Sequence, residues 1–347
     1  MAPNSALNVS VGVIAAILVS AAAYQASEVF APLALALFII ALVWPLQSWL
    51  QARMPTLLAL AITMVVTVAV CVLLASTVIW SFGRVGRSLL SDYGRYQTLY
   101  NAAVAWLEGH GISMAGVWTQ HFDVAWLLRA AQQITGRVNT TLSFWLIALV
   151  YVILGLMEVE DVCWRVKAYA KPETAHVLLT ASAETARKTR KYMEVRTQMS
   201  LATGILVGAF AWIVGLQFPL EWGVIAFVLN YIPFVGPFIA TLFPTLIEMS
   251  QLSSWGAVVG VFACLNVIQF VIGSYIEPRV SGAVLAMSPT VVLFAVFFGM
   301  FIWGLFGAFI GVPIAIAIIS FCSHHPSSRW VADLLGGRRE ERPLAQS

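Results

Sequence analysis

Charged side chains are scarce in this chain of 347 residues: only 10% are Asp, Glu, Lys or Arg, whereas 60% are hydrophobic. A soluble domain usually carries about a quarter charged residues, so an ordinary soluble fold is excluded. The formal net charge is only +3, and the basic residues lie in loops between apolar runs, so nucleic acid is not an expected partner. The composition predicts an integral membrane protein surrounded by the lipid bilayer.

The chain also lacks the residue groupings that metal, nucleotide and catalytic sites need. None of its four cysteines shares a C-x-x-C spacing, so they are interpreted as small buried hydrophobes. The five histidines lie outside the apolar runs, which indicates no buried catalytic or metal cluster. No G-x-x-x-x-G-K-[ST] motif is present, so ATP is not the expected driver. We predict no cofactor, no metal and no enzymatic activity.

Long apolar runs, by contrast, recur along the whole chain. A helix of about 20 apolar residues is long enough to cross a bilayer. No Lys or Arg precedes Arg53, so the first run lacks the charged start of a signal peptide and is expected to stay in the mature protein. The predicted membrane segments are residues 7–24, 29–50, 57–82, 142–157, 201–216, 222–249, 255–276 and 287–321. The expected fold is all-α: a polytopic helical membrane protein with about eight membrane segments.

Two polar regions separate these runs. Over residues 89–107, and again over 124–134, apolar side chains recur every three or four residues, as in an amphipathic helix. Residues 158–198 hold eight Lys and Arg side chains, and this excess predicts a cytoplasmic position. Within that second region, Glu184 and Lys188 stand one turn apart in the order that favours an ion pair.

Residues 230–237 read Asn-Tyr-Ile-Pro-Phe-Val-Gly-Pro in the middle of an apolar run. Pro233 and Pro237 lack a backbone N–H and crowd the preceding turn, so a regular helix is not expected to continue. At membrane depth, backbone groups freed in this way need partners inside the protein or in a water-lined cavity. Transporters often build their midplane sites from such broken helices, so the segment indicates transport.

A second run, residues 306–315, shares this sparse pattern of glycine, proline and aliphatic side chains. Paired interrupted segments point to the solute site of a transporter. Gly304, Gly307 and Gly311 have two open interpretations: they line such a site, or they let helices pack closely.

Few ionisable side chains lie within the apolar runs, where they are costly and usually face the protein interior. Glu28, Glu221 and Glu248 stand at the ends of their runs, where a position at the membrane interface explains them. Glu277 and Arg279 instead flank a proline. The two can neutralise each other, or Glu277 can accept protons or a cation.

Neutral polar side chains near these segments can complete a shared cavity or bond between helices. They are Asn230, Asn266, Gln269 and Ser274. Gln269, Gly273 and Glu277 are expected on one helix face, one turn apart. The predicted substrate or ion pathway comprises Asn230, Pro233, Gly236, Pro237, Gln269, Glu277, Arg279, Gly307, Gly311 and Pro313.

With these residues in view, the chain resembles the autoinducer-2 exporter family, also called the PerM-type permease family. The motifs that carry the resemblance are Arg190-Lys-Tyr-Met-Glu-Val-Arg196 with Ser200 and Gly204; Trp222-Gly223; Phe227-Val-Leu-Asn-Tyr-Ile-Pro-Phe-Val-Gly-Pro237; Gln269 with Glu277-Pro278-Arg279 and Gly282; Ser288-Pro289; and Gly304, Gly307, Gly311 and Pro313. The N-terminal part matches more loosely, through Leu42-Val-Trp-Pro-Leu46.

This resemblance implies an all-helical, multi-pass transporter that forms a homo-oligomer. Members are linked to export of the quorum-sensing signal autoinducer-2, and others to sodium–proton or lithium–proton antiport. The first hypothesis is a secondary transporter that exports a small polar solute or signal by alternating access, with or without ion coupling. One alternative is a Na+(Li+)/H+ antiporter that uses Glu277 and Glu248. The other is a non-transporting membrane scaffold whose external helices bind a partner.

The predicted organisation has four parts. These are N-terminal membrane helices at 1–82, an extracytoplasmic amphipathic helical region at 83–138, a transport core at 139–322 with a cytoplasmic helical loop at 158–198, and a cytoplasmic tail at 323–347. Both termini are expected in the cytoplasm of a multi-pass protein of the cell (inner) membrane. This count assumes that each interrupted segment crosses the membrane once.

Overall fold

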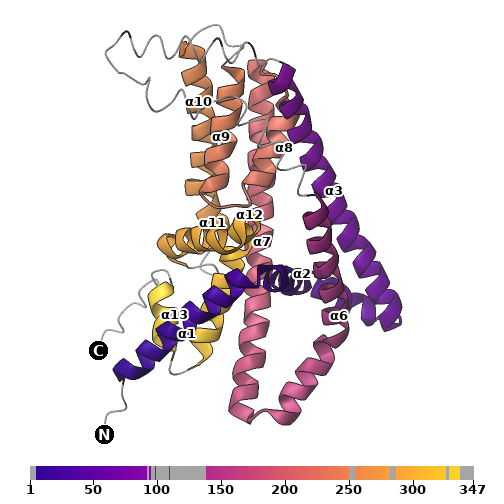
Figure 1. Ribbon diagram of the computed structural model, residues 1–347. Helices are drawn as coiled ribbons and strands as arrows, with labels where there is room; N and C mark the ends of the chain where they lie inside the picture. Colours follow the sequence, from indigo (N-terminus) through magenta and orange to yellow (C-terminus); the bar gives the residue numbers. More distant parts are fainter. Residues whose placement is uncertain are drawn as a thin grey trace, which may run out of the picture. The chain divides into compact units, whose positions relative to one another are not determined.

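The computed structural model describes residues 5–91, 94, 98, 109, 138–249, 255–281, 287–325 and 328–336. Its elements are α1 (Ser5–Gln25), α2 (Ser27–Gln51), α3 (Thr56–Ser91), α6 (Val138–Tyr169), α7 (Pro172–Val214), α8 (Pro219–Leu229), α9 (Val235–Glu248), α10 (Trp255–Phe270), η1 (Val271–Ile276), α11 (Glu277–Ser281), α12 (Pro289–His324) and α13 (Arg329–Leu335). Apart from one isolated bridge between Met287 and Gly336, the regular structure of these residues is helical (Figure 1). The all-α prediction is confirmed.

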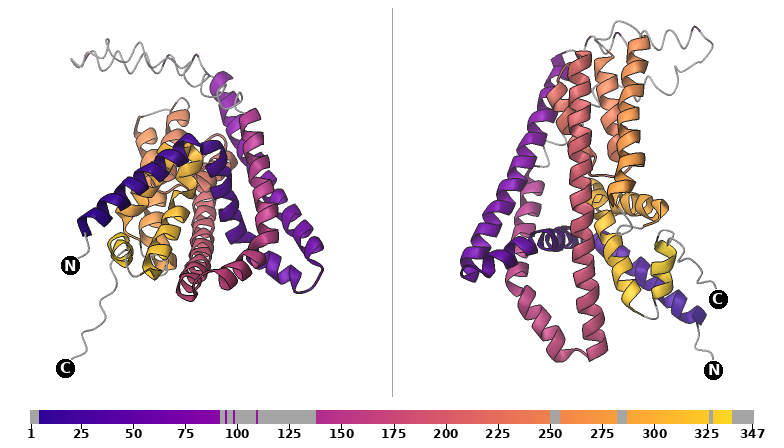
Figure 2. Two further views of the ribbon diagram at one scale, coloured as in Figure 1. Left: turned by 60° about the horizontal axis from the view of Figure 1, so that its bottom comes forward. Right: turned by 180° about the vertical axis from the view of Figure 1, so that it is seen from behind.

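The chain divides into two compact units. The first comprises residues 1–68, 144–195 and 281–347, and the second comprises residues 69–143 and 196–280. The helices α3 and α7 each contribute residues to both units. In the first unit, α13 packs beside α12 (Figure 2).

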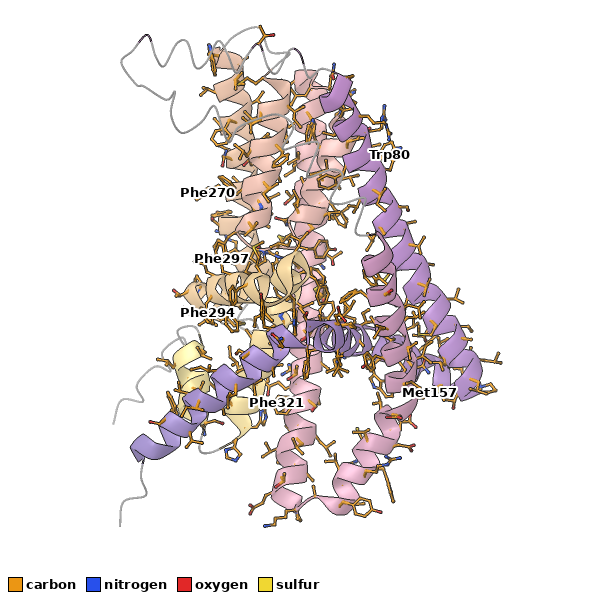
Figure 3. The ribbon with its side chains drawn as sticks, in the orientation of Figure 1. Trp80, Met157, Phe270, Phe294, Phe297 and Phe321 are labelled. Atoms are coloured by element: carbon orange, nitrogen blue, oxygen red, sulfur yellow. The ribbon has the colours of Figure 1, made fainter. Side chains whose placement is uncertain are left out.

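Five of the described helices are long and apolar enough to cross a bilayer. They are Ser27–Gln51, Thr56–Ser88, Pro172–Val214, Trp255–Val280 and Pro289–His324, with shorter apolar helices at Ser10–Gln25, Pro219–Leu229 and Val235–Ile247. The predicted span 142–157 lies within α6. Many large apolar side chains point outward; Phe270 and Phe294, labelled in Figure 3, are 67% and 64% exposed. Lipid is the surrounding that suits such a surface.

The longest helix, α7, runs without a break through the predicted cytoplasmic loop and the span that follows it. Its 43 residues measure roughly 65 Å at 1.5 Å per residue, about twice the thickness of a hydrocarbon core. The helix ends at Gly215, whose φ of +77° is in the left-handed region. The Leu216 amide donates to the carbonyl of Ala211, which is the hydrogen bond of a glycine-capped C-terminus.

The first interrupted segment is a helical hairpin in the second unit. The helices α8 and α9 are joined by a five-residue turn, 230–234, and pack side by side (Figure 1). A Cβ atom at Gly236 would overlap the carbonyl oxygen of Leu229. Only glycine therefore lets the start of α9 approach the end of α8 so closely.

The turn of this hairpin pairs much of its own backbone. The Ile232 amide donates to the carbonyl of Leu229 at 2.9 Å, and the Gly236 amide donates to the carbonyl of Ile232 at 3.0 Å. Pro237 lies in the first turn of α9, where a missing N–H leaves no gap in the helix. Fewer carbonyls are therefore left for a ligand than the two prolines suggest.

The second interrupted segment, α12, is also folded back on itself. Trp303 and Gly304 leave the helical conformation, and Gly304 has a φ of +63°. In a straight helix Ala295 and Gly311 would lie roughly 24 Å apart, at 1.5 Å per residue. Instead, a Cβ atom at Gly311 would overlap the carbonyl oxygen of Ala295. The two arms therefore pack backbone against backbone.

Both interrupted segments thus reverse direction, whereas the count from the sequence assumes that each crosses once. Pro233 lies in the turn after the first arm of the α8–α9 hairpin, and Gly304 ends the first arm of α12. The glycines of the second arms permit the close return. If both segments return to the side from which they enter, the predicted number of crossings falls by two and stays even. Both termini are therefore still expected on one side.

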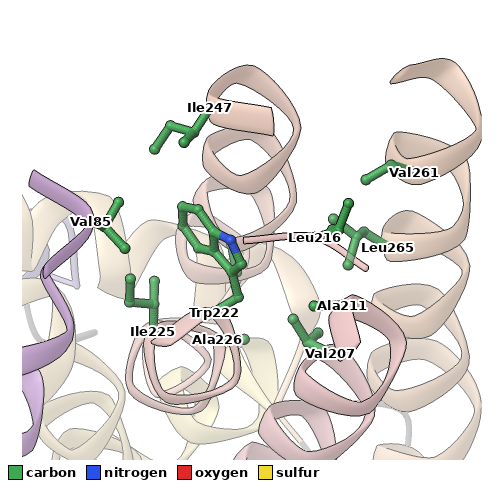
Figure 4. Packing of buried hydrophobic residues seen from close by; sticks show 11 residues of the cluster. Val85, Val207, Ala211, Leu216, Trp222, Ile225, Ala226, Ile247, Val261 and Leu265 are labelled. Carbon is green, nitrogen blue, oxygen red and sulfur yellow. The ribbon is translucent and has the colours of Figure 1, made fainter. Parts of the chain in front are cut away.

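The core of the second unit surrounds Trp222, which is 1% exposed. Figure 4 shows its ring among aliphatic side chains from α3, α7, α8, α9 and α10. The cluster comprises Val85, Val207, Ala211, Leu216, Trp222, Ile225, Ala226, Ala240, Ile247, Val261 and Leu265. In the first unit, Phe306 of α12 packs edge-on against Phe144 of α6, with ring centroids 5.0 Å apart. The predicted amphipathic helices at 89–107 and 124–134 lie almost wholly outside the described residues.

We expect the residues that flank the α8–α9 hairpin to face one side of the membrane, because the hairpin returns to the side from which it enters. In a background without the four native cysteines, Gln217→Cys and Met249→Cys should react with an impermeant maleimide from the same side of sealed vesicles. Glu173→Cys, at the other end of α7, should react from the opposite side. Labelling of the first two positions from opposite sides would show that the segment crosses.

Gly236→Ala should destabilise the protein, because the new methyl group meets a backbone carbonyl that cannot rotate away. A cost of about 1–3 kcal/mol is expected for such overpacking. Gly260→Ala is the matched control, since a Cβ atom there meets nothing within 4 Å, and the change should be neutral or stabilising by up to about 1 kcal/mol. Unfolding midpoints in detergent would compare the two, and equal stability would contradict the close approach.

Candidate functional site

A cluster of buried polar side chains lies where the α8–α9 hairpin meets α7. Arg196 and Ser200, one turn apart on α7, are 5% and 0% exposed. The Arg196 Nη1 donates to both carboxylate oxygens of Glu277, at 2.8 Å each. The Asn230 Nδ2 donates to the hydroxyl of Ser200 at 3.2 Å. One face of α7 therefore holds both the hairpin turn and the start of α11.

The ion pair between Arg196 and Glu277 uses only one nitrogen of the guanidinium, Nη1. The Arg196 side chain is 6% exposed and that of Glu277 is 26% exposed. An arginine commonly meets a carboxylate through two nitrogens, but here Nη1 takes both oxygens. The Nε of Arg196 is buried and has no hydrogen-bond partner among the described residues. Leaving such a donor unsatisfied costs about 1–3 kcal/mol or more for a charged group, so the site can accept an oxygen atom there.

Glu277 is delivered to this site by a π-helical turn. The helix α10 continues through η1 into α11, and the Glu277 amide donates to the carbonyl of Ile272, five residues back. A π turn holds more residues than an α turn and often occurs at functional sites. Gln269 is buried whereas Gly273 is exposed. The predicted single face of Gln269, Gly273 and Glu277 therefore does not form, because the π turn shifts the register.

Two predicted partners lie elsewhere. The guanidinium of Arg279 lies 3.9 Å from the ring centroid of Tyr275, so Glu277 pairs with Arg196 and not with Arg279. Asn266 is exposed and donates to the carbonyl of Phe262 on its own helix at 2.8 Å. It does not join the cluster.

The remaining predicted residues divide between the two units. In the second unit, Asn230, Pro233, Gly236 and Gln269 are buried and Pro237 is half-buried. The Nε2 of Gln269 has no hydrogen-bond partner within the described part of the chain. In the first unit, Gly307, Gly311 and Pro313 are buried in the second arm of α12. The two glycines form the contact between its arms.

Sequence reasoning missed the buried cation of the cluster. Arg196 stands at the end of the basic region 158–198, and Ser200 four residues later is one local sign of a polar stripe. The Tyr231 hydroxyl, which donates to the Thr197 hydroxyl at 3.0 Å, was also missed. Only the fold brings these positions to Glu277 and Asn230.

A second ion pair joins α3 to α8. The Arg84 Nη1 lies 2.6 Å from Oε1 of Glu221, whose side chain is 3% exposed. Glu221 lies in the first turn of α8, where the helix dipole favours a negative charge. Its partner is half-exposed, so the pair has one end toward the surroundings, as an interfacial position requires. The side chain of Glu248 lies outside what the structure describes.

A large groove in the second unit is apolar. Its volume is about 640 Å³, and α3, α7 and α8 line it with side chains such as Leu73, Ile205 and Val224. The hydroxyl of Thr77, one of its few polar groups, donates to the carbonyl of Leu73 in its own helix. The groove offers a polar solute no free partner, so the buried polar cluster is the better candidate site. Among the described residues, no three His, Cys, Asp or Glu side chains gather as metal ligands.

Comparison with known proteins identifies the family of this chain. The model of the AI-2E family transporters matches residues 13–326. The chain belongs to this family. It is therefore a multi-pass membrane transport protein and not an enzyme, and the resemblance found in its motifs is confirmed.

Two relatives match over nearly the full length. The AI-2 transport protein TqsA of Escherichia coli is 25% identical over 91% of this chain and 92% of its own. A putative transport protein of Haemophilus influenzae is 24% identical over 94% of this chain and 95% of its own. A putative transport protein of Borreliella burgdorferi is 31% identical over 55% and 52%.

A double-mutant cycle should show that Arg196 and Glu277 are energetically coupled. Glu277→Gln should be the more destabilising single change, by about 3–5 kcal/mol, because it leaves the more deeply buried charge unpaired. Arg196→Gln should cost less, since Glu277 is partly exposed. The double variant should recover much of the loss. Additive losses in thermal or denaturant unfolding would show that the pair is not coupled in the folded protein.

Proposed function

We propose that this AI-2E family member is a secondary transporter that exports a small polar solute or signal of the autoinducer-2 type by alternating access. The observation that carries the proposal is the buried Nε of Arg196, a charged donor without a partner, beside the Asn230–Ser200 hydrogen bond. Such groups bind a solute that brings acceptor oxygens. The relative TqsA is an AI-2 transport protein, which supports the same class of solute.

The charge of the site favours this solute over a metal cation. Na+ and Li+ are hard cations that need a cluster of acceptor oxygens, whereas the unpartnered buried atoms of Arg196 and Gln269 are nitrogens. The guanidinium would also repel a cation close to it. Sodium–proton antiport would require Glu277 to leave Arg196 first, so we place it second.

The ion pair suggests how protons could be coupled to transport. A buried guanidinium needs a counter-charge or strong acceptors, and Glu277 supplies them in this conformation. Protonation of Glu277 would weaken its hold on Arg196 and free the guanidinium for the solute. We propose this exchange as the coupling step, with the pathway formed by Asn230, Gln269, Glu277 and the hairpin residues Pro233, Gly236 and Pro237, and by Gly307, Gly311 and Pro313 of α12.

Several further features remain part of the proposal. We expect six crossings: one each for α1, α2, α3, α6 and α7, and one for the rod formed by α10 and η1. The hairpins α8–α9 and α12 would then enter from opposite faces of the membrane, and both termini would lie in the cytoplasm. A homo-oligomer is expected, as the family resemblance implies. Arg279 would lie at the cytoplasmic end of the rod, where Lys and Arg are favoured.

Purified protein in liposomes should move autoinducer-2 when a pH gradient is imposed, without sodium. Asn230→Ala should lower this flux roughly tenfold, the loss expected for one to two hydrogen bonds. Asn266→Ala is the matched control, because its amide bonds only to its own helix, and should keep full flux.

Other outcomes of this assay separate the rival functions. Proton movement driven by sodium alone, without solute, would favour the antiporter. Equal flux in the Asn230→Ala and Asn266→Ala variants would remove the polar cluster from the pathway. If protein that gel filtration shows to be folded moves neither solute nor ions, the scaffold is favoured.

A further inference from the structure

A cluster of ionisable side chains in the first unit joins α7 to the C-terminal end of α12. Glu184 of α7 pairs through Oε1 with the Nζ of Lys188, at 2.6 Å. Its other oxygen, Oε2, lies 3.3 Å from the Nε2 of His324. All three side chains are between 21% and 24% exposed. One carboxylate therefore serves a cation of its own helix and an imidazole of another.

Both ring nitrogens of His324 face acceptors. The Nδ1 lies 2.9 Å from the backbone carbonyl oxygen of Ser320, and Nε2 faces the carboxylate of Glu184. Neither oxygen can donate when the carboxylate is ionised. A neutral imidazole has one N–H and one lone pair, so it satisfies one contact and turns the lone pair toward an acceptor in the other. Only the protonated ring donates to both.

The nearby hydroxyl of Ser323 does not remove the preference of this site for a protonated His324 ring. The Ser323 Oγ donates to the carbonyl oxygen of Ser320 at 2.8 Å and also lies 3.2 Å from the Nδ1 of His324. It can turn to donate to a neutral ring, but it then gives up its bond to the carbonyl. The lone pair of Nδ1 would still face that carbonyl oxygen at 2.9 Å.

Charged residues of both signs lie on the elements that pack beside the end of α12. On α7, Lys188 opposes a positive ring and Glu184 favours it. On α13, which packs against α12, the charged residues are Arg329 and Asp333. The adjacent His325 is exposed. On α2, which also packs against α12, the charged residue is Glu28.

We propose that His324 is a pH-dependent link that fastens the end of α12 to α7 when its ring is protonated. Imidazole changes its charge between pH 5 and 8. The link is therefore closed at the acidic end of that range and open at the alkaline end. It joins the hairpin that contains Gly307 and Gly311 to the helix that contains Arg196. The inference concerns the contact itself and does not depend on the proposed solute.

Hydrogen exchange measured by mass spectrometry on the full chain in lipid nanodiscs tests the link. Wild type, His324→Gln and His325→Gln are compared with one another at about pH 6 and again at about pH 8, so that the intrinsic pH effect on exchange cancels. At about pH 6, His324→Gln should exchange roughly two- to fivefold faster near residues 316–325, the size expected for a partly exposed ion pair. At about pH 8 the variant should match wild type. His325→Gln should match wild type throughout.

Glu184→Gln provides a second test, because it removes the carboxylate and leaves the ring in place. It should reproduce the faster exchange of α12 at about pH 6. Equal exchange of wild type and His324→Gln at about pH 6 would overturn the proposal, because the contact would then not stabilise the end of α12. A difference of the same size at both pH values would also overturn it, since the role of His324 would then be independent of its protonation.

Discussion

Backbone amides and carbonyls inside a bilayer have to find hydrogen-bond partners within the protein, because lipid offers none. This constraint explains why the two interrupted segments are hairpins instead of frayed helices. The turn of the α8–α9 hairpin pairs its amides with its own carbonyls, and Gly236 permits the close return. In α12 the reversal at Trp303–Gly304 is supported by contact between the arms at Gly307 and Gly311.

The same scarcity of water makes buried charge costly, and the chain compensates it by pairing. Two ion pairs join helices that are far apart in the sequence: Arg84 with Glu221, and Arg196 with Glu277. Between helices in lipid, burial of apolar surface supplies little attraction, so packing and polar contacts do more of the work. These pairs therefore define helix neighbours as well as candidate functional groups.

The polar cluster and the apolar groove of the second unit differ in the hydrogen-bond partners that they offer a ligand. The groove has volume but offers a polar solute no free partner, so lipid suits it better. The cluster has a buried guanidinium with an unused donor, held by a carboxylate that is a quarter exposed. This partly exposed charge pair distinguishes the cluster from the groove.

The sequence by itself determined the membrane setting, the all-α class, the position of the first break and, through its motifs, the family. These follow from local properties: apolar run length, proline without an N–H, glycine without a side chain. The sequence predicted the second interruption at 306–315, whereas the helix breaks at Trp303–Gly304. It also pointed to Asn230 and Glu277 as polar groups that need partners. It could not decide that Glu277 pairs with Arg196, because those residues are 81 positions apart. Arg279 is nearer in the sequence and has the positive charge that Glu277 needs as a partner. That choice belongs to the tertiary structure, in which the π turn aims Glu277 at α7 and the hairpins return where a linear reading has them cross.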